Sequence, residues 1–168
     1  MKFNSDLSKV ITPVVVDDSY YFVNDLFQKK FGSPPPEYGN HLIGFYKNEK
    51  GCYLPVTYIS LTPYKGTMLV GGAMTDGEVI KQMTGEQKEI ISKTGGVYLN
   101  LLKYAFERFA NDCDAFFGYV NDPRALEVDL AAGFKETEYQ YVVANFHKSI
   151  SSWKKKKLFK VINKLGSF

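Results

Sequence analysis

Residues 121–134 read NDPRALEVDLAAGF, and this stretch decides how the second half of the chain is organised. Asp122 and Pro123 are typical of a helix start, because an Asp side chain caps free N–H groups and proline fits the first helical position. Gly133 is typical of a helix end, where the backbone adopts a left-handed conformation. The preceding run, residues 115–120, is short and apolar, which favours a buried strand. The sequence therefore predicts a strand followed closely by a helix that ends at Gly133.

Outward from this stretch, strands and helices alternate in a mixed order. Turn sequences separate the three strands expected over residues 41–74 so closely that they predict an antiparallel meander, while the second half predicts a βαβ-like crossover. Pro55 within this meander predicts an edge strand or a bulge. The fold class is therefore α/β, with a mostly antiparallel central sheet flanked by helices. The expected strands are residues 9–16, 41–47, 52–61, 67–74, 115–120 and 138–146, and the expected helices lie between residues 17–31, 84–93, 97–111 and 123–132.

Length and composition predict a globular protein. With 168 residues, 45% of them apolar, the chain suits one compact domain, and no apolar run reaches the roughly 18 to 20 residues of a membrane span. The first residues contain no apolar segment typical of a signal peptide, so we expect a cytoplasmic location. Cys52 and Cys113 form no CxxC pair and only two histidines accompany them, which argues against a disulfide framework and a metal site. Both cysteines are expected to be small buried residues.

The charge of the chain is concentrated near its end. Residues 1–147 carry 14 basic and 18 acidic side chains, whereas residues 148–168 carry seven lysines and no acid. This distribution argues against nucleic-acid binding by the main body. We expect a domain over residues 1–148 and a basic amphipathic helix within residues 149–168. The helix places one apolar stripe among lysines: Leu158, Val161, Ile162 and Leu165. Three interpretations remain open for it: contact with an anionic membrane surface, docking on the body or on a second copy, and disorder.

Residues 121–134 also resemble one segment of the GNAT superfamily of N-acyltransferases, in which a helix after the fifth strand ends in Gly-Phe. Ala125, Gly133 and Phe134 match that segment, while Asp122 stands where the family commonly has Asn. In the order of elements the resemblance covers roughly residues 9–147. It implies an acyltransferase fold that binds acyl-CoA, with Asp122 beside the cofactor.

The resemblance further implies that the acyl-CoA pyrophosphate binds where the long helix begins. The family's loop reads Gln/Arg-x-x-Gly-x-Gly/Ala, and the matching residues here are Lys93, Thr94, Gly95, Gly96, Val97 and Tyr98. Lys93 supplies the basic first residue and Gly96 the first glycine, whereas Tyr98 departs from the pattern. A glycine turn at a helix start also leaves N–H groups free for phosphate. The alternative is that the two glycines simply join two helices.

The end of the third meander strand matches the place where the family binds the pantetheine arm through backbone groups. The residues concerned are Ala73, Met74 and Thr75, and the preceding Gly71 and Gly72 would let a ligand approach closely. A packing constraint within the sheet explains the two glycines equally well.

The resemblance leaves catalysis open. Many family members carry a Tyr in the helix before Gly-Phe that protonates the leaving thiolate, but the matching residue here is Asp129. We expect an exposed, ionised Asp129, which is a poor proton donor at neutral pH. Tyr119 or Tyr139 could replace the missing tyrosine, and Asp76 lies near the position of a base.

Two functions follow from the resemblance. The first is an N-acyltransferase that uses acetyl-CoA, or another acyl-CoA, and transfers the acyl group to an unknown amine by direct attack. The second is a GNAT-like binding module that has lost transfer, which the missing Tyr and the missing second glycine favour. Such a module would be peripheral at a membrane if the basic tail binds lipid.

Overall fold

The computed structural model describes residues 3–168 and contains a seven-stranded central sheet. The strands are β1 (Ile11–Val16), β2 (Asn40–Lys47), β3 (Tyr53–Tyr64), β4 (Thr67–Thr75), β5 (Ala115–Tyr119), β6 (Lys135–Glu136) and β7 (Val142–Phe146). They lie in the order β1-β2-β3-β4-β5-β7-β6. Every neighbouring pair is antiparallel except β4 and β5, which run parallel. The mixed, mostly antiparallel sheet expected from the sequence is confirmed.

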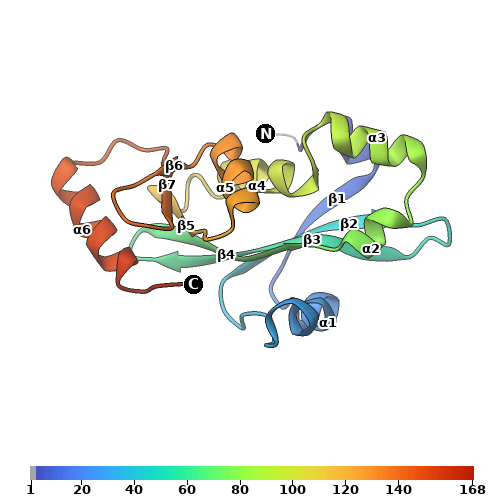
Figure 1. Cartoon of the computed structure of the whole chain (residues 1–168), viewed down its shortest axis with the longest axis horizontal. Coiled ribbons are helices and arrows are strands. Elements are labelled where there is room, and N and C mark those ends of the chain that lie inside the picture. Colours follow the sequence, from blue (N-terminus) through green and yellow to red (C-terminus); the bar gives the residue numbers. More distant parts are fainter. Residues whose placement is uncertain (1–2) are drawn as a thin grey trace.

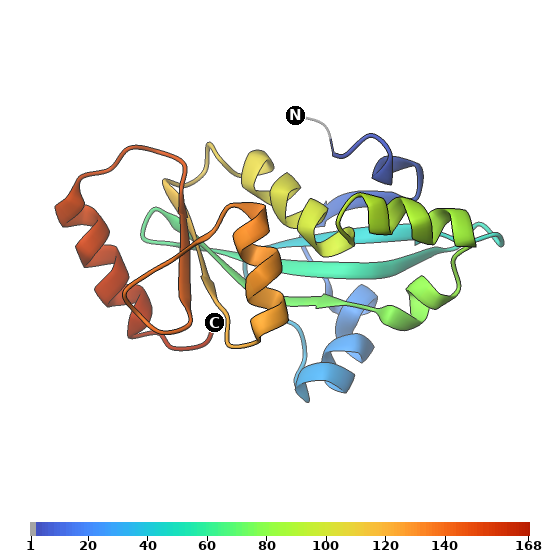
Figure 2. The same cartoon turned by 45° about the horizontal axis from the view of Figure 1, so that its top comes forward.

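Helices cover both faces of this sheet (Figure 1). They are α1 (Tyr20–Phe31), α2 (Gly77–Lys81), α3 (Gly85–Lys93), α4 (Val97–Arg108), α5 (Pro123–Ala132) and α6 (Ser152–Asn163), with a short 3-10 turn at Leu7–Lys9. In Figure 1, α3, α4 and α5 lie above the sheet and α1 lies below it, and the turned view of Figure 2 agrees. α6 stands at the end of the molecule that holds β5 and β7.

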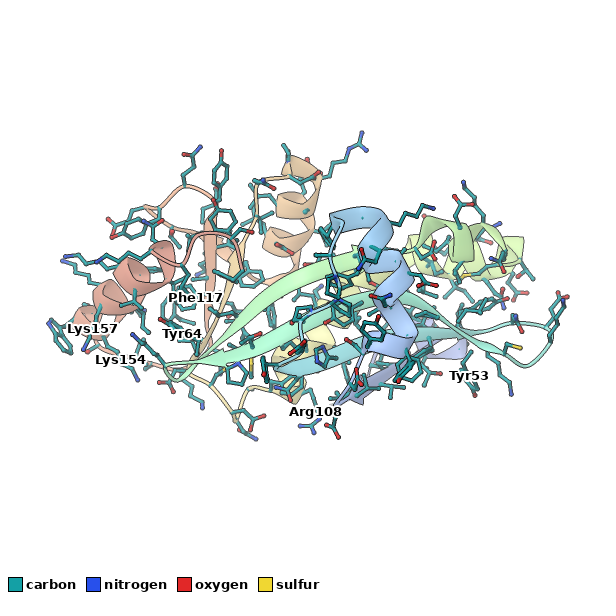
Figure 3. The ribbon with its side chains drawn as sticks, turned by 90° about the horizontal axis from the view of Figure 1, so that it is seen from below. Tyr53, Tyr64, Arg108, Phe117, Lys154 and Lys157 are labelled. Atoms are coloured by element: carbon teal, nitrogen blue, oxygen red, sulfur yellow. The ribbon has the colours of Figure 1, made fainter. Side chains whose placement is uncertain are left out.

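Neighbouring residues on β4 and β5 pack against different helices, because successive side chains on a strand point to opposite faces. Val70 and Phe116 are buried in a cluster formed with α4. Leu69 and Phe117, one position away on each strand, are buried with α6. Figure 3 shows Phe117 beside α6. α4 and α6 therefore cover opposite faces of the same two strands.

Local signals in the sequence set the ends of several helices. Thr84 accepts a hydrogen bond from the N–H of Gln87, whose side chain accepts one from the N–H of Thr84, which completes a capping box at α3. The Asp122 carboxylate caps α5, accepting from two backbone N–H groups. Gly133 ends the same helix with a φ of +117°, a conformation that glycine adopts without a steric cost. These predicted helix boundaries are confirmed.

The proline within β3 produces a bulge and not an edge strand. β3 lies in the middle of the meander, between β2 and β4. Its register with β2 shifts at this point, because Gly44 pairs with Thr57 while the next residue, Phe45, pairs with Pro55. Val56 is thus the extra residue, and its carbonyl accepts a hydrogen bond from the N–H of Asp76. The bulge accommodates a residue that cannot donate to the ladder.

Several parts of the sequence prediction are wrong in detail: β6 was not predicted, α4 ends at Arg108 and not at residue 111, and β3 extends to Tyr64 and not only to residue 61. The segment between Asp76 and the start of α3 contains the additional short helix α2, which Asp76 caps through the N–H of Glu78. The last strand begins at Val142 and not at residue 138. The Thr137 hydroxyl donates to the carbonyl of Val142 and accepts from the N–H of Tyr139, which closes a turn before the strand. Alternating aromatic residues in this turn imitate a strand pattern.

The basic tail forms a helix that docks on the chain's own sheet. Leu158 and Ile162 of α6 are buried in the cluster that contains Phe117 of β5. The Lys154 ammonium also donates to the Asp114 carboxylate at 2.6 Å, which holds the start of the helix to the body. Two of the four residues of the apolar stripe are therefore buried against the protein's own sheet. Lys154 and Lys155 face the body, whereas Lys156, Lys157, Lys160 and Lys164 are exposed.

Within residues 3–168, no helix combines the length and the apolar character that crossing a membrane requires. Cys113 is buried, as expected, but Cys52 is exposed, so the expectation that both cysteines are buried is wrong. Cys52 follows the exposed turn between β2 and β3, where neither helix layer reaches it.

Candidate active site

A cleft opens in the sheet where β4 and β5 stop pairing. The two strands pair over only three residues each, and the last pair joins Val70 to Gly118. Beyond this point β4 bulges, because Gly71 pairs with Ser60 whereas Met74 pairs with Tyr58, and Gly72 and Ala73 lie between them without a regular partner. A cavity of about 670 Å³ occupies the gap. This volume falls within the ~300–1,000 Å³ of typical small-molecule sites.

Side chains from both faces of the sheet line this cavity. Tyr98 of α4 and Asp129 of α5 come from one face, and Lys30 and Phe31 of α1 come from the other. The turn from β5 into α5 also lines the cavity, through Val120, Asn121 and Asp122. The cavity therefore connects the two faces through the sheet.

The half-buried Tyr98 and the buried Asp129 form a hydrogen-bonded pair that lines the cleft. The Tyr98 hydroxyl donates to the Asp129 carboxylate at 2.8 Å. Burial raises the pKa of Asp129 to about 6, although the hydrogen bond from Tyr98 acts in the opposite direction. Burial, followed by the negative charge of Asp129, raises the pKa of Tyr98 well above its ordinary value of 10. Asp129 therefore gains or loses its proton near pH 6, whereas Tyr98 keeps its proton at neutral pH.

The expectation that Asp129 is an exposed, ordinary carboxylate is wrong. Only 3% of the residue is exposed, because it faces α4 and not solvent. The helical pattern placed Asp129 beside Val128 and Leu130, but the structure exposes Leu130 and buries the acid. A buried carboxylate with a pKa of about 6 can exchange a proton near neutral pH, so Asp129 is a candidate for proton transfer.

The sequence matches no protein-family model and no curated protein. Among solved structures, the ribosomal-protein-S18-alanine N-acetyltransferase from Escherichia coli is similar with a TM-score of 0.52 at 10% identity, over 84% of this chain and 97% of that one. The putative N-acetyl transferase YhhK from Escherichia coli, solved bound to coenzyme A, is similar with a TM-score of 0.51 at 10% identity, over 81% and 98%. Such identities establish the architecture alone. The chain has the fold of the GNAT superfamily.

In this GNAT fold, the predicted pyrophosphate loop is the junction between α3 and α4. Gly95 and Gly96 both have positive φ, +85° and +99°, so this junction needs glycine. The Asn100 amide donates to the carbonyls of Thr94 and Gly96, at 2.8 Å each, and fixes the turn. Gly96 is the N-cap of α4 and has no side chain to cap it. The first N–H groups of α4 are thus left for an external acceptor.

The other residues of the predicted loop take different places. Lys93 pairs with Glu89 at 2.7 Å on the exposed side of α3 and does not line the cavity. Val97 is buried in the core between β1 and α3. Tyr98, which departs from the GNAT pattern, is the residue of this loop that lines the cavity.

The residues predicted to hold the pantetheine are divided by the bulge in β4. Ala73 lines the cavity, and its carbonyl accepts from the Lys30 ammonium at 3.2 Å. Met74 is buried against α1, and its carbonyl accepts from the Thr57 hydroxyl. Thr75 also contacts Thr57, through its own hydroxyl. The structure therefore brings Ala73 to the cleft, and it turns the side chains of the next two residues elsewhere.

Protein atoms already explain both glycines of β4. A Cβ added to Gly71 would lie 2.5 Å from the carbonyl oxygen of Phe168, and one added to Gly72 would lie 3.0 Å from the ring of Phe27. Gly72 also has a positive φ of +55°. The packing interpretation thus accounts for the sequence pattern, although Gly71 and Gly72 both line the cavity as well.

Of the candidate acids and bases, Tyr119 alone lies at the cleft. It ends β5 and lines the cavity, as does Asp122 at the start of α5. Hydrogen bonds from backbone N–H groups lower the pKa of Asp122, so its carboxylate serves the helix. Tyr139 packs near Phe159 of α6, and Asp76 caps α2, so neither lines this cavity.

Sequence reasoning missed several contributors to the cavity wall, and four of them lie far from any motif: Lys30, Phe31, Ser167 and Phe168. The first two end α1, and the last two follow α6. No local motif marks them, since each reaches the cleft only through the packing of its helix on the sheet.

Proposed function

We propose that this protein is an acyl-CoA-dependent N-acyltransferase that transfers an acetyl group to a primary amine. The lone pair of the amine forms the new bond to the acyl carbon, the carbon–sulfur bond breaks, and the sulfur leaves with the electron pair. The proton lost from the amine balances the charge of the leaving thiolate. The observation that carries the proposal is the cleft that crosses the sheet, with the uncapped start of α4 at one side and the Tyr98–Asp129 pair inside it.

The start of α4 suits the phosphate groups of acyl-CoA. Free N–H groups and the helix dipole favour an anion at a helix N-terminus. Gly96 also leaves open space, because a Cβ added there meets no atom within 4 Å. The similar YhhK structure from Escherichia coli was solved bound to coenzyme A, which supports the same ligand class here. Lys93 would contribute to this site only after leaving Glu89.

The cleft suits the thin pantetheine arm and the reacting thioester. The unpaired part of β4, at Gly71 to Ala73, offers backbone groups to a ligand. Asp129, with a pKa of about 6, is ionised at neutral pH and is a stronger base than an ordinary carboxylate, so it suits removal of the amine proton through Tyr98 or a water. Tyr119 lines the same cavity and is the candidate to protonate the leaving sulfur. The remaining contribution is orientation of the two reactants.

Calorimetry with acetyl-CoA tests the proposal. Gly96→Asp places a carboxylate where phosphate would bind, so we expect affinity to fall at least tenfold, about 1.4 kcal/mol. Gly96→Ala controls for the strain of a side chain at positive φ, and Gly85→Asp controls for a new charge at another helix start. Circular dichroism checks that each variant is folded. Normal binding by Gly96→Asp would exclude this site.

A second function, a GNAT-fold binding module without transfer, is favoured by Tyr98. Its phenol lies in the cleft where the family pattern has a small residue, and the bond to Asp129 holds it there. Absence of acetyl-CoA binding at high micromolar concentration, in both the parent chain and Tyr98→Ala, would support the module. Binding that is recovered only in Tyr98→Ala would show that this side chain closes the cleft.

We further propose that α6 binds anionic membrane surfaces through its outer side. Lys156, Lys157 and Lys160 line an open hollow of about 620 Å³ together with Trp153, which is 72% exposed. Lysines attract anionic lipid, and tryptophan favours the membrane interface. Because Leu158 and Ile162 are buried against the sheet, this binding would depend on charge and on Trp153, and not on the apolar stripe.

A further inference from the structure

A buried polar network joins the start of α1 to the sheet. Ser19, which precedes α1, His41 of β2 and Tyr58 of β3 are each at most 1% exposed. The Nδ1 atom of His41 lies 2.7 Å from the Tyr58 hydroxyl and 3.3 Å from the Ser19 hydroxyl. We call these three residues the His41 network. Figure 3 shows the face of the sheet on which the network lies, with α1 across it.

The Ser19 side chain serves this network and not the helix that it precedes. A serine at an N-cap commonly accepts a hydrogen bond from a backbone N–H group of the first turn. Ser19 occupies the N-cap of α1, but its side chain makes no such bond. Its hydroxyl instead contacts His41, 22 positions away in the sequence. This contact therefore ties the start of α1 to β2.

A narrow apolar stripe supplies the rest of the packing between α1 and the sheet. Among the twelve residues of α1, Val23 and Phe27 are the buried ones. Phe27 packs edge-on against Tyr58, with ring centres 5.2 Å apart, and its ring also lies beside Gly72 in the bulge of β4. A segment with so few buried apolar contacts opens more readily than the core, so each polar contact that anchors it matters.

The far end of α1 forms one wall of the cleft. Lys30 and Phe31 line the cavity, and the Lys30 ammonium donates to the carbonyl of Ala73 in the β4 bulge. Packed helices shift as rigid units. Release of α1 from His41 would therefore also move Lys30 and Phe31 away from β4.

The surroundings of His41 favour its neutral ring. Burial lowers the pKa of His41, while the negative charges of the exposed Asp18 and Asp17 act in the opposite direction. Tyr58 keeps its proton at neutral pH, because burial raises the pKa of its phenol. The residues that pair with His41 on the neighbouring strands, Val16 and Ser60, carry no charge.

A charged His41 ring does not fit the network. A protonated imidazole carries an N–H group on both ring nitrogens. The Nε2 atom of His41 is buried and has no hydrogen-bond partner among residues 3–168. Protonation would thus create a buried donor without an acceptor, which is costly. The closed arrangement of α1 is complete above pH 6.5, the ordinary pKa of the ring, and it weakens as the pH falls below that value.

We propose that the His41 network is a pH-sensitive switch for the cleft: the neutral ring holds α1 on the sheet, and protonation of His41 in mildly acidic solution releases α1 and widens the cleft at Lys30 and Phe31. The switch acts on a wall of the cavity, whichever ligand binds there. It is therefore independent of the acyltransferase function proposed above.

Hydrogen–deuterium exchange of the full chain at pH 7.5 and pH 5.0 tests the switch. After correction for the intrinsic effect of pH, we expect peptides from α1 to exchange about tenfold faster at pH 5.0, relative to peptides from α4, because the open state binds a proton that the closed state excludes. In His41→Asn and His41→Gln, which carry no charge at either pH, the ratio of α1 to α4 exchange should not change. Circular dichroism checks that both variants are folded.

Three further variants assign the effect to this network. His147→Gln removes the other histidine of the chain and should keep the parent response. Asp129→Asn removes the cleft carboxyl, whose pKa is about 6, and should keep it as well. Ser19→Ala removes the contact with His41 without removing a helix cap, so α1 should already exchange faster at pH 7.5.

Thiol labelling measures whether the movement reaches the cleft. Ala73→Cys in a Cys52→Ser background places a thiol at the cleft, and burial raises the pKa of Cys113 to about 11, which keeps that thiol unreactive. At pH 5.0, a maleimide should label the new thiol about tenfold faster when His41 is present than in His41→Asn, and at pH 7.5 the two chains should react alike. Comparison at a single pH removes the effect of pH on the thiol itself.

Each contrary result has a defined meaning. Parallel acceleration of exchange in α1 and α4 would overturn the switch, because the proton would then unfold the whole chain. An unchanged α1 in the parent, or the same response to pH in both neutral variants, would overturn it as well. Faster exchange of α1 without faster labelling would overturn the control of the cleft. None of these measurements depends on acetyl-CoA, so each result leaves the acyltransferase proposal to its own test.

Discussion

Replacement of Asp129 by Asn tests whether a carboxylate is buried at the centre of the cleft. Asn has nearly the same shape and can still accept the hydrogen bond from the Tyr98 hydroxyl, which is 2.8 Å from the carboxylate in the structure. Unlike Asp, it has no charge at any pH. The variant therefore removes the titration of this residue while it preserves the packing between α4 and α5.

The expected magnitude follows from the difference between two pKa values. The folded chain has a pKa of about 6 at Asp129, against an ordinary value of 3.8 in the unfolded chain. A raised pKa means that the folded state binds the proton more tightly, so the contribution to stability is complete below pH 3.8 and is lost as the pH rises through 6. A difference of about 2.2 corresponds to about 3 kcal/mol, of which about 2 kcal/mol falls between pH 4.5 and 8.

Urea denaturation of the parent, Asp129→Asn and Glu127→Gln at several pH values measures this contribution. Glu127 lies exposed on the same helix and controls for the loss of one negative charge. We expect the free energy of unfolding of Asp129→Asn, relative to the parent, to increase by about 2 kcal/mol from pH 4.5 to pH 8. The unpaired NH₂ group of the new Asn costs about 1–3 kcal/mol at every pH, so the change with pH is the quantity to compare.

The reasoning is refuted if the parent and Asp129→Asn change in parallel across this pH range. Such a result would mean that Asp129 titrates as an ordinary exposed carboxylate, and that α4 and α5 do not enclose it. A changed slope in Glu127→Gln as well would assign the effect to net charge and not to burial.

Two further predictions concern other parts of the molecule. Burial lowers the pKa of His41 below 6.5, so its contribution to stability is present above pH 6.5 and is lost as the pH falls below it; the urea midpoint of the parent, relative to that of His41→Gln, should therefore fall from pH 7.5 to pH 5.5. Reversal of two α6 charges, Lys156→Glu with Lys157→Glu, should lower the affinity for phosphatidylserine-containing vesicles about thirtyfold, since each lysine near the surface contributes ~1 kcal/mol. Sedimentation with the vesicles measures this affinity. The matched reversal of Lys50 and Lys65, in turns between strands of the meander, should have little effect, and equal losses in both variants would contradict a role of α6.

Much of the fold was predictable because its signals are local. Thr84 and Gln87 lie three residues apart and form the capping box predicted from their spacing. Asp122 and Gly133 mark the two ends of α5 through groups that lie within one helical turn of each end. Interactions of this kind depend on neighbouring residues, so the sequence states them directly. The short turns between the first strands of the meander likewise left antiparallel pairing as the simple arrangement.

The same local reasoning gave wrong predictions where one sequence pattern is compatible with two structures. The alternating aromatic residues before β7 read as a strand, but Thr137 closes a turn there through its hydroxyl. Asp129 read as a solvated helix residue, because a charged side chain among apolar neighbours does not reveal which side of the helix is covered. The packing of α5 against α4 decided that question.

By itself, the sequence determined the order of strands and helices, most of their ends, and the concentration of positive charge after residue 147. Only the tertiary structure decided what meets at the cleft. The Tyr98–Asp129 bond joins residues 31 positions apart, and Phe168 reaches Gly71 only because α6 docks on Phe117. Hydrogen-bonded turns and caps are set by adjacent residues, whereas burial, and the pKa that follows from it, depends on which distant surfaces pack together.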